Sequence, residues 1–330
     1  MSVDHDGDRQ RGAERGRDAT APGEIPAKGW KDVAWRLYHE LTDDRVLLIS
    51  AGVTFYLLLA LGPLLAALVS IYGLFLDPAD IAAQAGALAG VVPGGGIDIL
   101  TGQLERLAGA DQGTLGLAFV VSLGLALWSA NAGMKAMFQA MNVAYDEKET
   151  RGFVKKTLVT LAFTVLTIVG IIALAVFNAL FTTFEESVGL SLPDWLAHLI
   201  TALAALLALI VLMACLYRFG PCRESPRWQW ITPGAVLAGV AIVIVSALFT
   251  FYVANFGSYN ETYGSLGALV GFLTWLWLVV VVLVMGGELN AEMEHQTARD
   301  TTTGEVEPMG ERGATVADDL GRAYGVERGA

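Results

Sequence analysis

Six long apolar stretches without a charged side chain alternate with polar connectors along this chain of 330 residues. The six stretches are 46–76, 112–134, 157–184, 195–217, 228–260 and 262–287. Each exceeds the about 20 residues that a helix needs to cross a bilayer, where the backbone must satisfy its own hydrogen bonds. The pattern predicts an all-α, multi-pass membrane protein whose six helices span about 46–76, 113–137, 157–184, 195–217, 231–255 and 264–287.

Two smaller helical patterns flank the first span. In residues 30–41, apolar positions recur at helical spacing, opposite charged residues such as Asp32 and Arg36. This pattern predicts an amphipathic helix that lies on the inner membrane surface. In residues 81–107, two apolar stripes are separated by Pro-Gly-Gly-Gly at 93–96, which predicts an outer helical hairpin between the first two spans.

The two ends of the chain lack apolar periodicity and are rich in glycine and charged residues. Segments of this composition bury too little apolar surface to offset the entropy of ordering. Residues 1–27 and 297–330 are therefore predicted to be disordered tails on either side of a membrane domain at 28–296. No apolar segment follows the basic residues of the N-terminus, so a cleavable signal peptide is not expected.

Basic residues are distributed unequally between alternate connectors. Of the 21 Lys and Arg residues, 20 lie near the two ends and around the second and fourth connectors, which leaves only Arg106 for the other three connectors. Because cytoplasmic connectors carry the excess of Lys and Arg, both termini are predicted to be cytoplasmic, as an even number of spans requires. The net charge of −12 comes largely from the acidic termini and does not favour nucleic acid as a partner.

Polar residues inside or beside the spans are candidates for a polar path, because such residues are costly in hydrocarbon and often functional. The candidates are Asn131, Lys135, Tyr145, Arg151, Tyr259, Asn260, Tyr263 and Glu288. Alternatives stay open for three of them. Asn131 is also suited to bond two helices together, Lys135 to reach the headgroups, and Glu288 to be a hydrated carboxylate at the membrane edge.

Proline and glycine mark positions where helices bend or approach one another closely. The residues predicted to kink a helix or to allow close packing are Pro63, Pro221, Pro233, Gly264, Gly267 and Gly271. Gly267 and Gly271 form a Gly-x-x-x-Gly pair, a common packing signal in membrane helices that does not identify the neighbouring helix.

Residues that would support catalysis or metal binding are scattered along the chain. The four histidines are His5, His39, His198 and His295. No two of them are at metal-ligand spacing, and Cys215 and Cys222 are spaced unlike a redox pair or a zinc half-site. The sequence contains neither a nucleotide-binding Gly-Lys loop nor a Gly-x-Ser-x-Gly motif. We therefore predict no catalytic residue, cofactor or metal site, and expect that the protein is not an enzyme.

Seven short motifs follow one another at characteristic spacing. They are FYLLLALGPLL at 55–65, WSANAGMK at 128–135, MNVAYDEKETRGF at 141–153, LYRFGP at 216–221, PGA at 233–235, YNETYGSLGA at 259–268 and GGELNAE at 286–292. Together they resemble the YihY/BrkB family of bacterial inner-membrane proteins, once labelled ribonuclease BN. The resemblance covers roughly residues 30–294 and implies a six-span protein without a securely established activity, in a family whose members have been suspected of transport.

Two functions of different class fit these observations. A small secondary transporter or exporter of a solute or lipid would use intramembrane polar residues and helix-bending prolines without a catalytic cluster. A non-transporting membrane scaffold would recruit envelope enzymes through its tails and outer hairpin, so deleting both tails should abolish only the scaffold function. A ribonuclease is least favoured. The expected partners are the lipid bilayer and an unidentified solute or lipid, and association with further copies of the chain is left open.

Overall fold

The computed structural model describes residues 12–72, 101–102, 117–188, 193–256 and 267–325. Its named helices are η1 (Pro22–Glu24), α2 (Ala27–Asp43), α3 (Val46–Tyr72), α6 (Leu117–Ala144), α7 (Phe153–Val188), α8 (Asp194–Phe219), α9 (Trp228–Phe256), α11 (Gly267–Glu294) and α12 (Thr315–Asp318). The all-α class is thus confirmed for the described residues, where strand-like pairing is limited to one isolated bridge. The outer hairpin predicted at 81–107 lies outside them, apart from the helical residues 101–102.

Five of the described helices are long and apolar enough to cross a membrane, by length and composition. They are α3, α7, α8, α9 and α11. α6 covers most of the predicted second span, but its described part does not meet the same criterion. Its second half carries Asn131, Lys135, Gln139 and Asn142, which make it more polar than the others. The predicted second span at 113–137, and with it the total of six, therefore stays a prediction.

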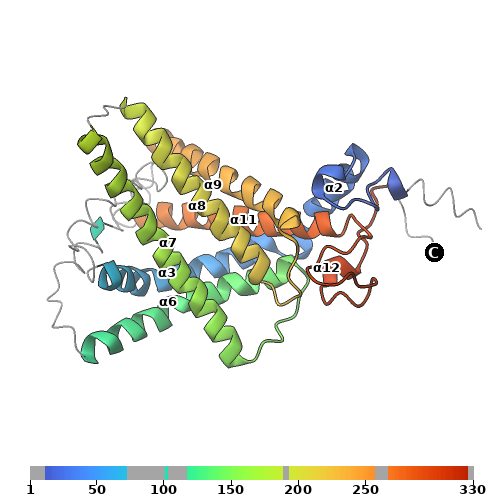
Figure 1. Ribbon diagram of the computed structural model, residues 1–330, viewed down its shortest axis with the longest axis horizontal. Helices are drawn as coiled ribbons and strands as arrows, with labels where there is room; N and C mark the ends of the chain where they lie inside the picture. Colours follow the sequence, from blue (N-terminus) through green and yellow to red (C-terminus); the bar gives the residue numbers. More distant parts are fainter. Residues whose placement is uncertain (1–11, 73–100, 103–116, 189–192, 257–266, 326–330) are drawn as a thin grey trace, which may run out of the picture.

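The long helices form a bundle built on two closely packed pairs (Figure 1). α3 packs along α6, α9 packs along α11, and α11 also contacts both α3 and α6. The main core lies where these four helices meet, around side chains such as Met141, Ile231 and Val284. α7 packs on α6 and α8 packs on α9, which leaves both outer helices with large exposed faces.

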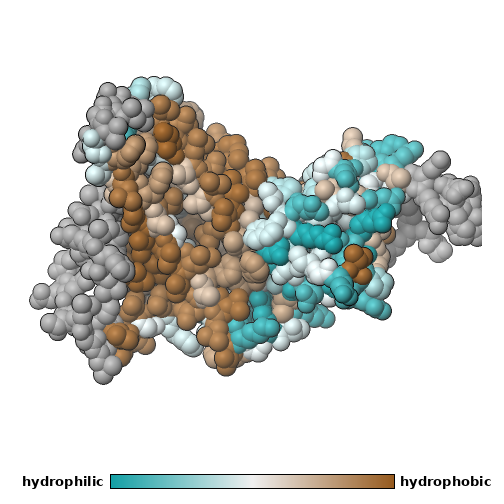
Figure 2. All heavy atoms as spheres, viewed as in Figure 1, coloured by the Kyte–Doolittle hydropathy of each residue, from teal (hydrophilic) through white to brown (hydrophobic). Residues whose placement is uncertain are grey.

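The outer surface of the bundle is apolar over most of its length (Figure 2). Large side chains exposed there include Leu125, Leu180, Leu207 and Leu248, from four different helices. Soluble monomers rarely expose apolar patches larger than a few hundred Å². A belt of this kind is the surface that the hydrocarbon of a bilayer covers, so the fold agrees with the membrane protein that the sequence predicts.

One end of the bundle carries a hydrophilic unit, which we call the polar cap (Figures 1 and 2). It comprises residues 12–45, 145–152, 219–227 and 295–325, and includes α2 and α12. A small apolar core connects it to the bundle. The core residues are Ala19, Ile25, Val33, Trp230, Leu289 and Met293. The polar cap is therefore a packed extension of the bundle.

The polar cap contains much of the two segments that the sequence predicts to be disordered tails. Residues 12–27 and 297–325 are described by the structure, and several of their side chains are buried. Thr301 is fully buried, Ala19 is 4% exposed and Arg312 is 5% exposed. The expectation of disorder at 1–27 and 297–330 therefore differs from what the structure shows over most of these ranges.

Arginine side chains that bind main-chain carbonyl groups explain this order. Arg17 donates to the carbonyl oxygens of His295 at 3.0 Å and Gly321 at 2.5 Å. Arg312 donates to those of Ala298 at 2.8 Å and Ala317 at 2.6 Å. Hydrogen bonds of this charge-assisted kind are among the stronger ones in proteins. They leave no periodic apolar pattern in the sequence, and reasoning from hydrophobicity therefore misses them.

Helix α2 coincides with the predicted amphipathic helix, but two charged residues of its polar side are buried. Asp32 is 0% exposed and Arg36 is 5% exposed, although the apolar spacing predicts that both face away from the apolar side. Arg15 donates to Asp32 at 2.6 Å, and Arg36 pairs with Glu292 of α11. The charges are buried because each has a partner of opposite sign. The position of α2 on a membrane surface stays a prediction.

Candidate functional site

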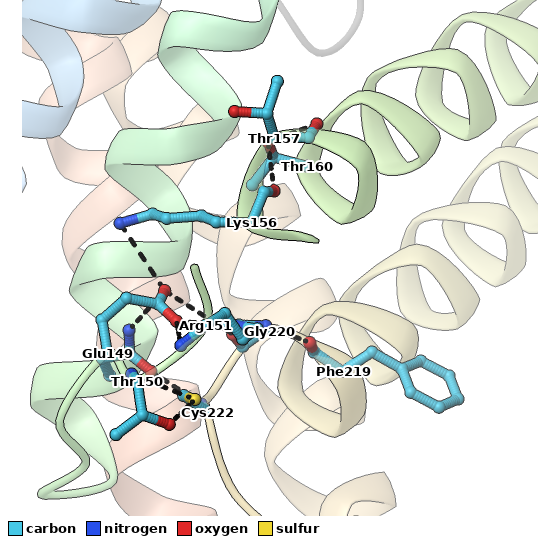
Figure 3. A network of polar contacts seen from close by, with 10 residues as sticks. Glu149, Thr150, Arg151, Lys156, Thr157, Thr160, Phe219, Gly220 and Cys222 are labelled. Carbon is cyan, nitrogen blue, oxygen red and sulfur yellow. Dashed lines mark hydrogen bonds and ion pairs between the residues drawn. The ribbon is translucent and has the colours of Figure 1, made fainter. Parts of the chain in front are cut away.

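The connector between α6 and α7 is tied to the end of α8 by hydrogen bonds (Figure 3). Arg151 Nη2 donates to the carbonyl oxygen of Gly220 at 2.8 Å, across 69 positions of sequence. The backbone N–H of Cys222 donates to Asn142 Oδ1 at 2.7 Å. The MNVAYDEKETRGF and LYRFGP motifs therefore meet in one structural unit at the base of the bundle.

Glu149 holds Arg151 in position for this contact. Its carboxylate oxygens accept hydrogen bonds from Arg151 Nε at 2.7 Å and from Nη2 at 3.0 Å. Lys156 lies 3.5 Å from the same carboxylate. Burial raises the pKa of Glu149, but the hydrogen bonds and charge of Arg151 outweigh it, and the pKa falls to about 2. The charge of Arg151 is thus compensated within the connector.

Helices α9 and α11 cross closely because two glycines face each other. A Cβ atom at Gly234 would overlap the carbonyl oxygen of Gly286 and the side chain of Asn290. Pro233 has no N–H and disturbs the hydrogen bonding of α9 at this point. The Asn290 side chain supplies bonds there, because it accepts from the Gly234 N–H at 2.9 Å and donates to the Ile231 carbonyl at 3.1 Å. The PGA and GGELNAE motifs are two halves of one helix contact.

Arg223 and Glu294 form a fully buried ion pair where the bundle meets the polar cap. The Nη2–Oε2 distance is 2.7 Å, the Nη1–Oε1 distance is 3.1 Å, and both side chains are 0% exposed. The Thr301 hydroxyl donates to Glu294 Oε2 at 2.6 Å, and the guanidinium lies 5.3 Å from the centre of the Tyr145 ring. Each charge is costly to bury alone, so neither residue can be removed without consequence for the other.

Six buried polar residues belong to α3, α6 and α7, three helices that pack on one another, and we call this set the polar seam. It consists of Ser50, Thr54, Asn131, Thr157, Thr160 and Thr164. The Thr164 hydroxyl lies 3.4 Å from Asn131 Oδ1. Among the described residues, three buried seam atoms lack a hydrogen-bond partner: Ser50 Oγ, Asn131 Nδ2 and Thr157 Oγ1. Leaving a buried polar group unpaired costs about 1–3 kcal/mol, so these atoms mark a place suited to water or a polar ligand.

Carboxyl groups from α2, α11 and the connector after α6 gather at the same end of the bundle. Glu288 of α11 is 2% exposed, its Oε1 has no hydrogen-bond partner, and its carboxyl group interacts with that of Asp44. Burial, followed by the charges of Glu292 and Asp44, raises the pKa of Glu40 to about 7. Burial and the charge of Asp146 raise the pKa of Asp44 to about 6. Carboxyl groups at this end therefore hold protons close to neutral pH.

The structure separates the predicted polar-path residues into different environments. Asn131 lies in the polar seam, and Tyr145 and Glu288 are buried at the base of the bundle. Arg151 lies in the α6–α7 connector, bound to Glu149. The arrangement brings Tyr145 and Glu288 to one end of the bundle, and it leaves Arg151 on the outer side of that end.

Lys135 contacts two exposed aromatic rings. Its Nζ lies 5.0 Å from the centre of the Trp128 ring and 5.4 Å from that of Phe153. Both rings are more than half exposed on the apolar surface. This is the geometry that the headgroup-reaching alternative for Lys135 predicts. The remaining path candidates, Tyr259, Asn260 and Tyr263, lie outside the described residues.

The predicted prolines occupy different kinds of position. Pro63 lies inside α3 and Pro233 inside α9. Pro221 lies in the connector after α8 and takes no part in a described helix. The Asn290 side chain of α11 bonds to α9 beside Pro233. The Asn142 side chain of α6 accepts a hydrogen bond from Cys222 beside Pro221.

Of the three glycines predicted to allow close packing, the structure describes the surroundings of Gly271 alone. Gly264 lies outside the described residues, and Gly267 is buried at the first position of α11. A Cβ atom at Gly271 would meet nothing within 4 Å. The close approach on α11 is at Gly286 instead, where a Cβ atom would overlap the Tyr217 hydroxyl.

Sequence reasoning missed five residues that build the base of the bundle. They are Asp44, Arg223, Gly234, Gly286 and Glu294. Gly234 and Gly286 lie in the PGA and GGELNAE motifs of the family resemblance, so these motifs could have indicated the two glycines. The charged residues lie next to span ends, where a charge is normally expected to be hydrated. No pattern in a single sequence shows that Arg223 and Glu294 meet.

The histidines and cysteines of the described residues contact groups other than a set of metal ligands. In the ranges that the structure describes, no group of three or more His, Cys, Asp and Glu side chains could hold a metal ion. His295 lies 3.5 Å from Glu292, and His39 Nδ1 lies 2.8 Å from the Trp35 carbonyl oxygen. Cys215 and Cys222 are both free and partly buried.

Comparison with known proteins finds bacterial relatives, two of which are named as membrane proteins. A ribonuclease-like protein named YfkH from Bacillus subtilis is 35% identical over 181 residues, which are 52% of this chain and 65% of that protein. The UPF0761 membrane protein Smlt0865 from Stenotrophomonas maltophilia is 27% identical over 263 residues, 78% of this chain and 59% of its own. The UPF0761 membrane protein XCC0860 from Xanthomonas campestris is 30% identical over 177 residues, 54% of this chain and 40% of its own.

These matches therefore cover less than two thirds of each relative's length. No solved structure matches the chain. The family model described as Virulence factor BrkB matches residues 37–309. This range begins in α2 and ends beyond α11 in the polar cap, so it includes part of the C-terminal segment. The predicted resemblance is confirmed, and the chain belongs to the BrkB virulence factor family.

Proposed function

We propose that the chain is a six-span transporter of the bacterial inner membrane that moves a small solute or a lipid, with both termini in the cytoplasm. The unequal distribution of Lys and Arg between alternate connectors supports this orientation. We assign the predicted second span to α6, because it packs along α3 and, like α11, is 28 residues long. The polar cap then faces the cytoplasm.

The polar seam is the observation that carries this proposal. Ser50, Asn131 and Thr157 each bury an unpaired polar atom between helices whose outer faces are apolar. Within a membrane, such groups are expensive and are usually retained for a function. A transporter accounts for them because water or a passing polar substrate provides the missing hydrogen bonds. A purely structural bundle would be more stable with apolar residues at these positions.

Flux through reconstituted protein tests the proposal. The full-length chain is purified, inserted into liposomes and assayed with labelled ions, polar osmolytes and phospholipids with a fluorescent headgroup. We expect at least one of these probe classes to cross or change leaflet faster than in protein-free liposomes. Absence of protein-dependent movement for every class would overturn the transporter proposal.

Asn131 distinguishes a transport path from a simple bond between helices. In Asn131→Leu the apolar side chain fills similar space, so a path residue should lower flux while the melting temperature stays unchanged or rises. Leu125→Ala, at an exposed apolar position of the same helix, is the matched control and should keep wild-type flux. A large loss of thermal stability in Asn131→Leu, with unchanged flux per folded molecule, would assign Asn131 to helix association instead.

A membrane scaffold is the second candidate, and exposed apolar side chains on the polar cap favour it. Val306 is 77% exposed, and Met309, Leu320 and Tyr324 are also exposed in an otherwise hydrophilic unit. These side chains are suited to contact a partner protein. If the chain is a scaffold, Val306→Ser combined with Met309→Ser should abolish partner recruitment. If these substitutions leave recruitment unchanged while the protein carries flux, transport is favoured.

Deleting both tails does not separate the two candidates. Residues 12–27 and 297–325 contain Arg17 and Arg312, which hold the polar cap together. Their loss would disturb the cap in a transporter and in a scaffold alike. Substitutions of the exposed apolar side chains avoid this difficulty. We propose no enzymatic activity and no nucleic-acid partner, and the lipid bilayer is the partner that both candidates require.

A further inference from the structure

The Glu288 side chain is the least compensated charge-bearing group at the base of the bundle. It is 2% exposed, and its Oε1 atom has no hydrogen-bond partner. Among titratable groups of the described residues, Asp44 interacts with Glu288 most strongly, and the two carboxyl groups are positioned to share a hydrogen bond. A carboxylate oxygen only accepts hydrogen bonds, so a bond between two carboxyl groups requires a proton on one of them.

The groups that face this pair do not supply a compensating positive charge. Glu40 and Asp43 belong to α2, Asp146 and Tyr145 to the connector after α6, and Glu292 and His295 to the end of α11. The nearby basic groups, Arg36 and His295, both lie against Glu292. Arg45, which follows Asp44, is exposed. An ionised Glu288 would therefore be buried among acidic neighbours without a cation.

The geometry points to a proton-binding site in which Glu288 and Asp44 share one proton at the junction between the bundle and the polar cap. Two carboxyl groups in contact cannot both ionise without strong repulsion, so the pair binds its proton as a unit. A proton fits better than a metal ion, because no group of three or more ligand side chains in the described residues could hold a metal.

This site goes beyond the proposed function and does not depend on it. Proton binding is an equilibrium property of the folded chain, and it is measurable in a protein that moves no solute. If transport also occurs, the pair is placed to release or take up a proton at the polar-cap end. Failure of the flux assay would thus leave the site intact, and failure of the site would leave transport without this coupling group.

Infrared difference spectroscopy on the full-length protein in lipid tests the site. The readout is the carbonyl stretch of a protonated carboxylic acid, followed while pH is raised from about 5 to about 9 and identified by its shift in heavy water. We expect the wild type to keep such a band near neutral pH and to lose it at higher pH. Glu40 also holds a proton near neutral pH, so both substitutions are made in a Glu40→Gln background. There, Glu288→Gln should lose the band, and Asp44→Asn should keep a band that is shifted in frequency and in the pH at which it disappears, because Glu288 has lost the partner of its hydrogen bond.

Glu307→Gln, at an exposed position of the polar cap, is the matched control and should keep the band. Thermal melting of each variant confirms that it is folded, and glutamine and asparagine preserve the shape of the protonated acids. A wild type without the band at any pH in this range overturns the site. A band that is lost in Glu288→Gln but keeps its frequency and its pH dependence in Asp44→Asn also overturns it, because the proton then belongs to Glu288 alone.

Discussion

The bundle and the polar cap differ in where each keeps its polar groups. The bundle exposes leucines to the outside and buries a few hydroxyl and amide groups, some of them without partners. The polar cap also buries charged side chains, among them Asp32, Arg36 and Arg312, but each of these is bonded, and its other charged residues, such as Glu307, are exposed to solvent. Each region suits a different solvent. The bundle is built for hydrocarbon, where its backbone is satisfied internally, and the cap is built for water.

This difference teaches that the two regions respond to different perturbations. The bundle depends on close approach between helices, which a single added methyl group disturbs. The polar cap depends on compensated charges, which a single neutralising substitution leaves unbalanced. Each region can therefore be perturbed without the other.

The largest effect is expected for Arg223→Ala, which leaves Glu294 buried without its partner. Breaking a buried ion pair from one side typically costs about 3–5 kcal/mol, so the variant should unfold far more readily in a detergent titration. Arg299→Ala is the control, because Arg299 and Asp18 are largely exposed and 3.9 Å apart. Equal stability of the two variants would contradict the buried pair.

A smaller loss is expected for Arg151→Ala. The substitution removes charge-assisted hydrogen bonds to Gly220 and Glu149, worth about 1.5–3 kcal/mol together with the unpaired groups they leave. Cys222 lies in the segment that this contact holds, so its thiol should react faster with an alkylating reagent. Lys155→Ala, at an exposed position nearby, should leave the alkylation rate unchanged. An unchanged rate in Arg151→Ala would show that the connector is held by other contacts.

Gly234→Val tests the bundle rather than the polar cap. Its side chain would overlap Gly286 and Asn290, and overpacking of this kind costs about 1–3 kcal/mol. Gly271→Ala lies in α11 where a Cβ atom meets nothing, so it should be neutral or slightly stabilising. Thermal melting in detergent separates them. If Gly271→Ala proves the more harmful variant, the helix crossing is elsewhere.

The smallest effect is a pH dependence centred on Glu40. Its pKa is raised from the ordinary 4.5 to about 7, so between these values the folded chain holds a proton that the unfolded chain has released. Stability should therefore fall as pH rises from about 4.5 to about 7. Glu40→Gln cannot ionise and should melt higher than wild type at pH 8, with little difference at pH 4. The prediction would be contradicted if the melting temperatures of the wild type and of Glu40→Gln both rose between about pH 4.5 and about pH 7.

Sequence pattern predicts the bundle better than the polar cap, for a physical reason. A span must be apolar along its whole length, so α3, α7, α8, α9 and α11 are visible as continuous runs. α6 is less clear, because Asn131 and Lys135 interrupt it. In the polar cap, Arg17 and Arg312 act through main-chain carbonyl groups, which every residue possesses. No composition rule distinguishes such an arginine from a hydrated one.

The residues of the candidate site also differ in how well the sequence predicts them. Asn131 and Glu288 could be singled out because polar residues are rare near membrane helices. Their alternatives could not be resolved, because the outcome depends on which residues of other helices lie opposite. Asp44 was not singled out at all, since an acidic residue after a surface helix is ordinary in sequence. Only the fold brings it to Glu288.

The bonds of Arg17 have a consequence for how the chain is made. Arg17 is translated 304 positions before one of its acceptors, Gly321. Asp32 and Arg36 similarly bind groups that are translated much later, among them Tyr324 and Glu292. During translation the membrane helices can insert while these charges remain unmatched. The cap therefore closes only after the bundle has been made, and a chain terminated before Gly321 would leave Arg17 without this bond.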